Sequence, residues 1–227
     1  MKSPIIFLHG ALGCANNFEP LLSMFPEDQP VYAIDLPGHG SKQPDEAFSL
    51  QLFSDSILKF LDEKQFDKVI IFGYSMGGYA ALNMAAKWPN KIEKVITLGT
   101  KLAWNPEVAA GMVKIFNPEV IEAKVPKFAA MLDAAHADWK TLCRYTTAFL
   151  LDLGNGLGIQ EADFRNISCP VTIGWGSEDN VVSKEESLHV AQLISLGNFV
   201  ELESTKHQLE LVDLNILFKF VEKALKP

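Results

Sequence analysis

Cysteine is scarce in this sequence, and the few cysteines present are neither paired nor clustered. Cys14, Cys143 and Cys169 are odd in number and lie far apart along the chain. A disulfide framework or a zinc site requires cysteines at short, matched spacings. We therefore expect three free thiols, no metal and no other cofactor, in the reducing environment of the cytoplasm.

Long apolar runs and clusters of positive charge are also missing. No stretch reaches the roughly 18 apolar residues that a membrane span requires. The first buried strand is expected to begin at Pro4, which leaves no room for an export signal. Acidic residues number 28 against 20 lysines and arginines, so the net charge is −8. These features argue against nucleic acids and anionic membranes as partners, and we expect a soluble monomer or homodimer that binds a small molecule.

The chain is organised around a glycine-rich turn at residues 73–77, Gly-Tyr-Ser-Met-Gly. The apolar residues Val69 to Phe72 before it predict a buried parallel strand, and small residues after Gly78 predict a helix packed closely on that strand. So abrupt a passage from strand to helix forces Ser75 into a strained conformation, for which the flanking glycines leave room. Ser75 also lies at a helix start, where backbone N–H groups favour developing negative charge. The turn therefore predicts a serine nucleophile.

A phosphate-binding loop is the main alternative for a glycine-rich turn between a strand and a helix. Two glycine patterns are typical of such loops, G-x-G-x-x-G and G-x-x-x-x-G-K-[ST]. Neither pattern fits residues 73–81. The spacing therefore excludes a dinucleotide site and a P-loop here, and it favours the nucleophile.

Strands and helices alternate along the first part of the chain, as a parallel sheet with crossover helices requires. We predict an α/β fold with a mostly parallel sheet of about six strands flanked by helices. The expected strands are residues 4–8, 30–35, 69–72, 94–98, 170–175 and 199–202. Helices are expected from about residue 17 to 25 and from about 49 to 63, among others. A chain of 227 residues can bury one large core and still carry an insertion.

The alternation stops at residues 101–167, where no strand is expected and three prolines divide several helical segments. An insertion that follows the carboxyl end of a strand falls over the site at that edge of the sheet. We therefore predict a helical cap at residues 101–167, on a core formed by residues 1–100 and 168–227.

The predicted cap contains basic and apolar side chains whose roles the sequence does not decide. The basic ones would either recognise an anionic substrate or, as we favour, form a solvated face: Lys101, Lys114, Lys124, Lys127, Arg144 and His136. Some of the apolar side chains line a pocket, and the others form the cap's own core. Our candidates for the substrate pocket are Leu12, Tyr74, Lys101 and Trp104.

A serine hydroxyl needs a base close by, and that base needs a third group to fix its tautomer. Among five histidines, only His207 is expected in a loop directly after a late strand, at the same sheet edge as Ser75. Asp179 follows the preceding strand and is our choice for the orienting acid. Glu178 is the rival acid, and Asp152 in the predicted cap is a weaker one.

The loop at residues 9–13, His-Gly-Ala-Leu-Gly, follows the first strand and is expected at the same edge of the sheet. We predict that the backbone N–H groups of Ala11 and Met76 together bind an oxyanion. The alternative is that this loop only makes a turn and starts a helix.

Taken together, these motifs resemble the α/β-hydrolase superfamily over essentially the whole chain. The shared motifs are H-G-A-L-G, D-L-P-G-H-G-S, G-Y-S-M-G-G, and the late aspartate and histidine, in that family's order. The resemblance implies a nucleophile at Ser75, a base at His207, an orienting acid at Asp179, and oxyanion donors at Ala11 and Met76. Two features depart from the family: no antiparallel hairpin precedes the first strand, and a lysine stands before the late histidine.

The family resemblance implies a hydrolase that acts on a carboxylic ester or related acyl compound through an acyl-enzyme. The motifs also resemble enzymes of the menaquinone pathway that eliminate pyruvate with the same triad, although Tyr79 stands where that subgroup commonly has arginine. A hydrolase of carbon–carbon bonds and an esterase of acyl carrier protein are further alternatives. A small-molecule receptor on the same fold is an alternative of another class.

Overall fold

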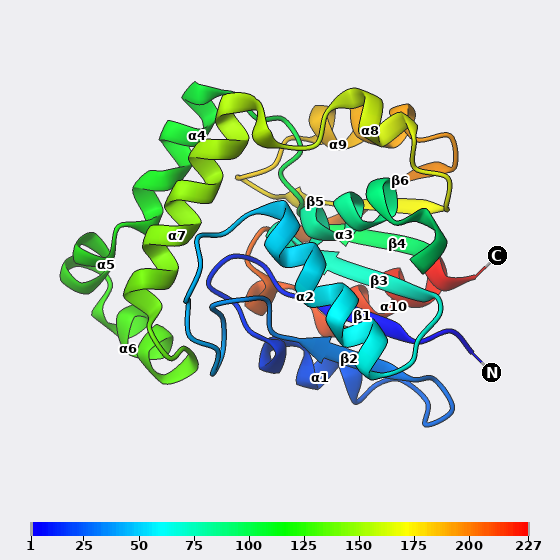
Figure 1. The fold of residues 1–227 in the computed structure, drawn as a ribbon, viewed down its shortest axis with the longest axis horizontal. Coiled ribbons are helices and arrows are strands. Elements are labelled where there is room, and N and C mark those ends of the chain that lie inside the picture. The colour runs from blue at the N-terminus through cyan, green and yellow to red at the C-terminus, as the bar shows by residue number, and fades with distance from the viewer. Residues whose placement is uncertain (1, 227) are drawn as a thin grey trace.

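The computed structural model describes residues 2–226, and a single parallel sheet runs through the middle of this part of the chain (Figure 1). Its strand order is β2-β1-β3-β4-β5-β6, and every neighbouring pair is parallel. The strands are β1 (Ile5–Leu8), β2 (Val31–Ile34), β3 (Val69–Tyr74), β4 (Ile92–Leu98), β5 (Val171–Glu178) and β6 (Gly197–Lys206). The predicted parallel α/β architecture is confirmed.

Helices cover both faces of the sheet, because alternate strand residues point to opposite sides. Ile6 and Leu8 of β1 belong to the core under α2, α3 and α9, whereas Ile5 and Phe7 belong to the core under α1 and α10. These helices are α1 (Glu19–Leu22), α2 (Leu50–Glu63), α3 (Met76–Lys87), α9 (Lys184–Leu193) and α10 (Leu214–Leu225). The two apolar cores fix the sheet, and they leave its carboxyl edge free for polar groups.

Between β4 and β5 lies the insertion, residues 101–167, which is helical within its described length. Its helices are α4 (Pro106–Met112), α5 (Pro118–Lys124), α6 (Pro126–Ala135), α7 (Trp139–Asp152) and α8 (Glu161–Arg165). The three prolines each occupy the first position of a helix, where the missing N–H costs nothing. Helices α4 to α7 lie beyond the end of the sheet at which the strands terminate (Figure 1). Helix α8 instead packs against α3 and α9.

Several element boundaries differ from those expected from the sequence, and two elements differ most. The helix predicted at 17–25 is a 3-10 turn, Ala15–Phe18, followed by the short α1. Pro20 lies in the first turn of α1, so its missing N–H could not serve a helix that began earlier. Strand β6 continues to Lys206, because its polar end still pairs with β5. Within the described residues, no helix combines the length and the apolar character that a bilayer crossing requires.

Candidate active site

Ser75 occupies the turn between β3 and α3 in the strained conformation that the sequence predicts. Its φ is 51° and its ψ is −116°, a region that residues with a side chain rarely adopt. The turn can form because a β-carbon on Gly77 would collide with the carbonyl oxygen of Leu8, and one on Gly73 would lie 2.5 Å from Gly78 N. The Ser75 N–H donates to Leu98 O of β4 at 2.9 Å, which fixes the turn to the sheet.

The structure brings the side chains of Ser75, His207 and Asp179 together at the carboxyl edge of the sheet. Ser75 Oγ lies 3.4 Å from His207 Nε2, and His207 Nδ1 lies 2.8 Å from Asp179 Oδ2. Asp179 follows β5 and His207 follows β6, so three strand ends supply the three groups. The side chains of His207 and Asp179 are 14% and 1% exposed, which keeps this hydrogen-bonded pair largely out of water.

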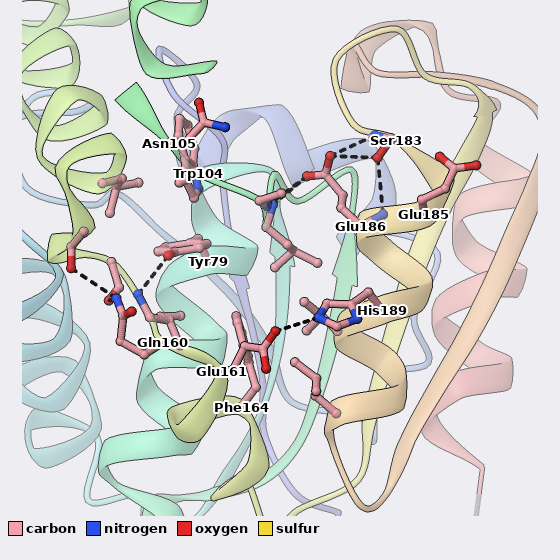
Figure 2. Close-up of a pocket in the computed structure, with 18 residues that line it drawn as sticks. Tyr79, Trp104, Asn105, Gln160, Glu161, Phe164, Ser183, Glu185, Glu186 and His189 are labelled. Atoms are coloured by element: carbon pink, nitrogen blue, oxygen red, sulfur yellow. Dashed lines mark hydrogen bonds and ion pairs between the residues drawn. The ribbon is translucent and has the colours of Figure 1, made fainter. Parts of the chain in front are cut away.

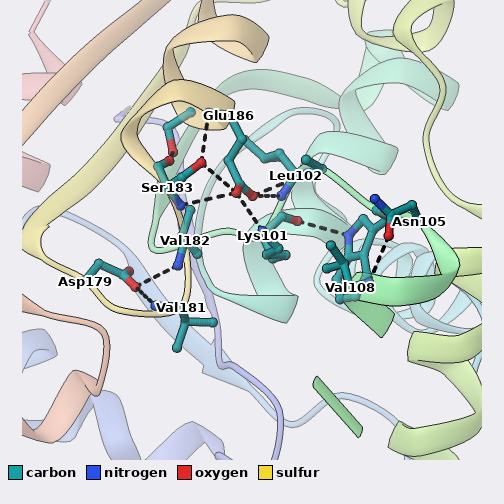
Figure 3. A network of polar contacts seen from close by, with 12 residues as sticks. Lys101, Leu102, Asn105, Val108, Asp179, Val181, Val182, Ser183 and Glu186 are labelled. Atoms are coloured by element: carbon teal, nitrogen blue, oxygen red, sulfur yellow. Dashed lines mark hydrogen bonds and ion pairs between the residues drawn. The ribbon is translucent and has the colours of Figure 1, made fainter. Parts of the chain in front are cut away.

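Asp179 is held from two sides. Its Oδ1 accepts from the N–H groups of Val181 and Val182 at 2.8 and 2.9 Å, which leaves Oδ2 for the imidazole (Figure 3). Burial raises the pKa of this carboxyl, but the His207 hydrogen bond and charge and the two backbone donors outweigh it and hold the pKa below its ordinary value. The rival acids Glu178 and Asp152 are both exposed.

His207 is positioned by two residues behind it. The Tyr74 hydroxyl donates to the His207 carbonyl oxygen at 2.6 Å. Tyr74 is therefore packed behind the imidazole and does not line the cavity beside Ser75, contrary to its selection as a pocket candidate. Gly99, at φ 61°, lies against the hydrogen-bonded pair of His207 and Asp179, where a β-carbon would be 3.3 Å from both Asp179 Oδ2 and His207 Nδ1. We did not select Gly99 from the sequence. The signal that could have found it is its position directly after a buried strand.

The loop at residues 9–13 lies next to Ser75. A β-carbon on Gly10 would be 2.8 Å from the Tyr74 ring and 3.1 Å from Ser75 Cβ, so only glycine allows this approach. Met76 begins α3, where an N–H has no acceptor inside the helix. Within residues 2–226, the N–H groups of Ala11 and Met76 form no hydrogen bond. Both residues line the cavity that contains Ser75.

That cavity is small, about 40 Å³, and mostly apolar. Its walls come from the turns after β1 and β3, from the insertion and from the loop after β5. The lining residues are Ala11, Ser75, Met76, Tyr79, Lys101, Trp104, Met112, Phe116, Phe149, Leu150, Leu153 and Val181. The pocket candidates Lys101 and Trp104 are among them. Leu12 is not, because it packs instead between the core and the insertion.

Lys101 does not belong to a solvated face. Its side chain is 16% exposed, and its Nζ lies 2.6 Å from Glu186 Oε2. Glu186 also accepts from the N–H of Leu102 at 2.8 Å, and it contacts Ser183 (Figure 3). Burial raises the pKa of Glu186, but the Lys101 hydrogen bond and charge and the backbone donors hold it below its ordinary value. The ammonium is therefore neutralised within the protein and is not free for an anionic ligand.

A second, larger cavity of about 620 Å³ lies between α3, α9 and the end of the insertion (Figure 2). It shares Tyr79, Trp104 and Leu153 with the small cavity, so these side chains form the wall between the two. Tyr79 is 3% exposed. Its hydroxyl accepts from the Ile159 N–H at 2.9 Å, and burial raises its pKa to about 12. No pattern in the sequence indicates this wall, because Tyr79 and Ile159 are 80 residues apart.

Within residues 2–226, no group of three or more His, Cys, Asp or Glu side chains is placed so that it could hold a metal ion. The three cysteines are buried and free. His39, in the loop after β2, is buried, and its Nδ1 donates to Pro37 O at 2.9 Å. His189 is on the exposed side of α9, where it lies 2.9 Å from Glu161.

Comparison with known proteins places this geometry in a family. An esterase of Mycobacterium tuberculosis is 28% identical over 210 residues, which are 81% of this chain and 69% of that protein. The crystal structure of an enol-lactonase from Burkholderia xenovorans superposes with a TM-score of 0.79 at 18% identity, over 99% of this chain and 92% of that one.

The chain spans less than half the length of several curated relatives that it matches. One of them, a probable alcohol acetyltransferase of Wickerhamomyces anomalus, is 25% identical over 142 residues, 61% of this chain and 40% of that protein. The family model described as alpha/beta hydrolase fold matches residues 3–138. Because that match covers more than half of the sequence, and the sheet and the strand-to-helix turn agree with it, the chain belongs to the alpha/beta hydrolase family.

Proposed function

We propose that this protein is a serine hydrolase that cleaves carboxylic esters or related acyl compounds through an acyl-enzyme. The observation that carries the proposal is the chain of polar contacts from Ser75 Oγ through His207 to Asp179, starting at a strained turn. A serine hydroxyl becomes an effective nucleophile only when a base accepts its proton, and an oriented imidazole is such a base. The esterases and hydrolases among the relatives are consistent with this activity.

In the first step, Ser75 Oγ attacks the ester carbonyl carbon while its proton passes to His207 Nε2. Asp179 keeps the other imidazole proton on Nδ1 and stabilises the imidazolium that forms. The tetrahedral intermediate then collapses, the bond to the alcohol oxygen breaks, and Nε2 returns the proton to that oxygen. Water repeats the sequence on the acyl-enzyme, with His207 again as the base, and releases the acid.

The negative charge of the tetrahedral intermediate needs donors that are already in place. The N–H groups of Ala11 and Met76 meet this need, because both residues line the cavity and form no hydrogen bond within residues 2–226. Met76 adds the favourable field of the α3 N-terminus. We propose that these two amides bind the oxyanion.

The size of the cavity favours a short acyl group. By the same measure of volume a single water needs roughly 10–15 Å³, so about 40 Å³ accommodates roughly three atoms of that size. The apolar walls suit a hydrocarbon tail. We propose that the wild-type enzyme hydrolyses esters with acyl groups from acetyl to butyryl. We also propose that the insertion acts as the cap that closes the site.

The charge distribution argues against elimination of pyruvate from an anionic substrate. Tyr79 replaces the arginine of that subgroup, and its hydroxyl is occupied by the Ile159 N–H. Lys101 is paired with Glu186. Among the described residues, no free cationic side chain lines the small cavity, so the hydrolase is the better-supported function.

The test compares the wild type with Ser75→Ala on p-nitrophenyl acetate and butyrate. Loss of a triad nucleophile should lower kcat by about 10⁴ to 10⁶. Ser23→Ala, at an exposed serine after α1, is the matched control and should keep the wild-type rate. A fluorophosphonate should label the peptide that contains Ser75. Equal rates for the wild type and Ser75→Ala would overturn the proposal and favour a receptor.

A further inference from the structure

Three buried histidines meet between the core and the insertion. His9 and His39 belong to two loops of the core, and His136 follows α6 in the insertion. The ring centroids of His9 and His39 are 4.6 Å apart, and those of His39 and His136 are 5.9 Å apart. All three are less than 9% exposed, so His136 is not on the solvated face to which we assigned it.

His136 connects the insertion to both of these core loops. Its Nδ1 accepts from the Gly40 N–H at 3.0 Å, and its Nε2 lies 3.0 Å from the carbonyl oxygen of Leu12. These partners require a neutral imidazole with its proton on Nε2. Burial lowers the pKa of His136, which favours that form. A second link beside it, from the Ala137 N–H to Gly40 O at 2.9 Å, is made by backbone alone.

The Leu12 bond matters because Leu12 is strained and directly follows Ala11. Its φ is 59°, a left-handed conformation that costs a leucine free energy and persists only where its surroundings enforce it. The turn is closed by a bond from the Gly13 N–H to Gly10 O at 3.1 Å. If Leu12 relaxed, the turn that carries the Ala11 N–H would change shape.

We propose that His136 is a positioning residue, which holds Leu12 and thereby aims the Ala11 N–H at the oxyanion. This inference rests on the proposed hydrolase function. It assigns the insertion a part in transition-state stabilisation as well as in substrate binding. His136 itself does not line the cavity, so its effect reaches the substrate only through the turn.

Two conservative variants separate the two hydrogen bonds of His136. In His136→Asn, the amide oxygen reaches about as far as Nδ1 and keeps the Gly40 contact, but the Leu12 contact is lost. In His136→Gln, the amide nitrogen reaches about as far as Nε2 and keeps the Leu12 contact. His136→Ala removes both. If His136 only ties the insertion to the core, both amide variants should lose activity. If His136 positions Leu12, His136→Asn should lose activity and His136→Gln should keep it.

The measurement is kcat and KM for p-nitrophenyl butyrate, with active sites counted by fluorophosphonate titration. Removal of an oxyanion donor costs about 10² to 10³ in kcat, so a displaced donor in His136→Asn and His136→Ala should cost about 10-fold, with KM within about 2-fold of the wild type. His136→Gln should keep kcat within about 3-fold. Equal loss in the Asn and Gln variants, or no loss in any variant, would overturn the inference.

A readout that needs no turnover separates failure of this inference from failure of the proposed function. The ¹H–¹⁵N resonance of Ala11 should shift in His136→Asn and His136→Ala, and it should stay near the wild-type position in His136→Gln. The same Ala11 resonance in all four proteins would overturn the positioning role, even if the wild type hydrolyses esters. Inactivity of the wild type, with the expected Ala11 shifts, would overturn the hydrolase and leave the geometry intact.

Discussion

Substituting Asp179 by asparagine should nearly abolish activity without unfolding the protein. Asp179 Oδ1 accepts from the N–H groups of Val181 and Val182 at 2.8 and 2.9 Å. An asparagine must keep its carbonyl oxygen at this position, because its NH₂ group has no acceptor there. The NH₂ group then takes the place of Oδ2, 2.8 Å from His207 Nδ1.

The NH₂ group forces the wrong tautomer on the imidazole. Facing a donor, Nδ1 must become an acceptor, and the proton moves to Nε2, which lies 3.4 Å from Ser75 Oγ. A protonated Nε2 cannot accept the serine proton. A change of this kind in a serine triad costs about 10⁴ in kcat, or about 5.4 kcal/mol of transition-state stabilisation.

The assay is p-nitrophenyl acetate hydrolysis at pH 8, with thermal unfolding as the check on folding. Glu178→Gln is the matched control: Glu178 is adjacent in sequence but exposed, and its variant should keep the wild-type rate within about 2-fold. An Asp179→Asn rate within 10-fold of the wild type would refute the reasoning, as would an equal loss in Glu178→Gln.

Two further predictions concern the cavity wall and the buried histidines. Tyr79→Leu should open the wall and raise the ratio of p-nitrophenyl octanoate to p-nitrophenyl acetate hydrolysis by about 10-fold. Tyr79→Phe keeps the ring and should leave this ratio unchanged. An unchanged ratio in Tyr79→Leu would argue against the wall. Burial lowers the pKa of His9 from 6.5 to about 4, so between these values the unfolded state binds more protons and the free energy of unfolding falls as the pH drops. Urea unfolding should show a loss of about 2 kcal/mol at pH 5 relative to pH 8 from His9 alone, and equal or greater stability at pH 5 would contradict this.

The parts of the fold that the sequence predicted are those with a local signal. The apolar run before Ser75 and the glycines around it specify a strand, a turn and a helix within a few residues, and the structure contains them. Alternation of strands and helices likewise predicted the parallel sheet. Asp179 and His207 were chosen as candidates because each directly follows a strand, and parallel strands end at one edge.

The features that sequence reasoning missed depend on contacts between distant residues. Tyr74 lies at the end of β3, where a pocket residue is expected, but its hydroxyl donates to a carbonyl oxygen 133 positions away. His136 has polar and small neighbours typical of a surface, yet it is buried by two core loops. No periodicity in the sequence reports such pairings, because they depend on how the insertion sits on the sheet.

The same distant contacts bear on how the insertion, our proposed cap, can move. It is joined to the core by several polar contacts, among them those of His136 with Leu12, Ile159 with Tyr79, and Lys101 with Glu186. Lifting the whole insertion would leave partly or fully buried polar groups without partners, at about 1–3 kcal/mol each unless water replaces them. Opening as one rigid body is therefore disfavoured. Substrate entry is better served by local movement of α5, which takes no part in these contacts and carries the exposed apolar side chain of Val120.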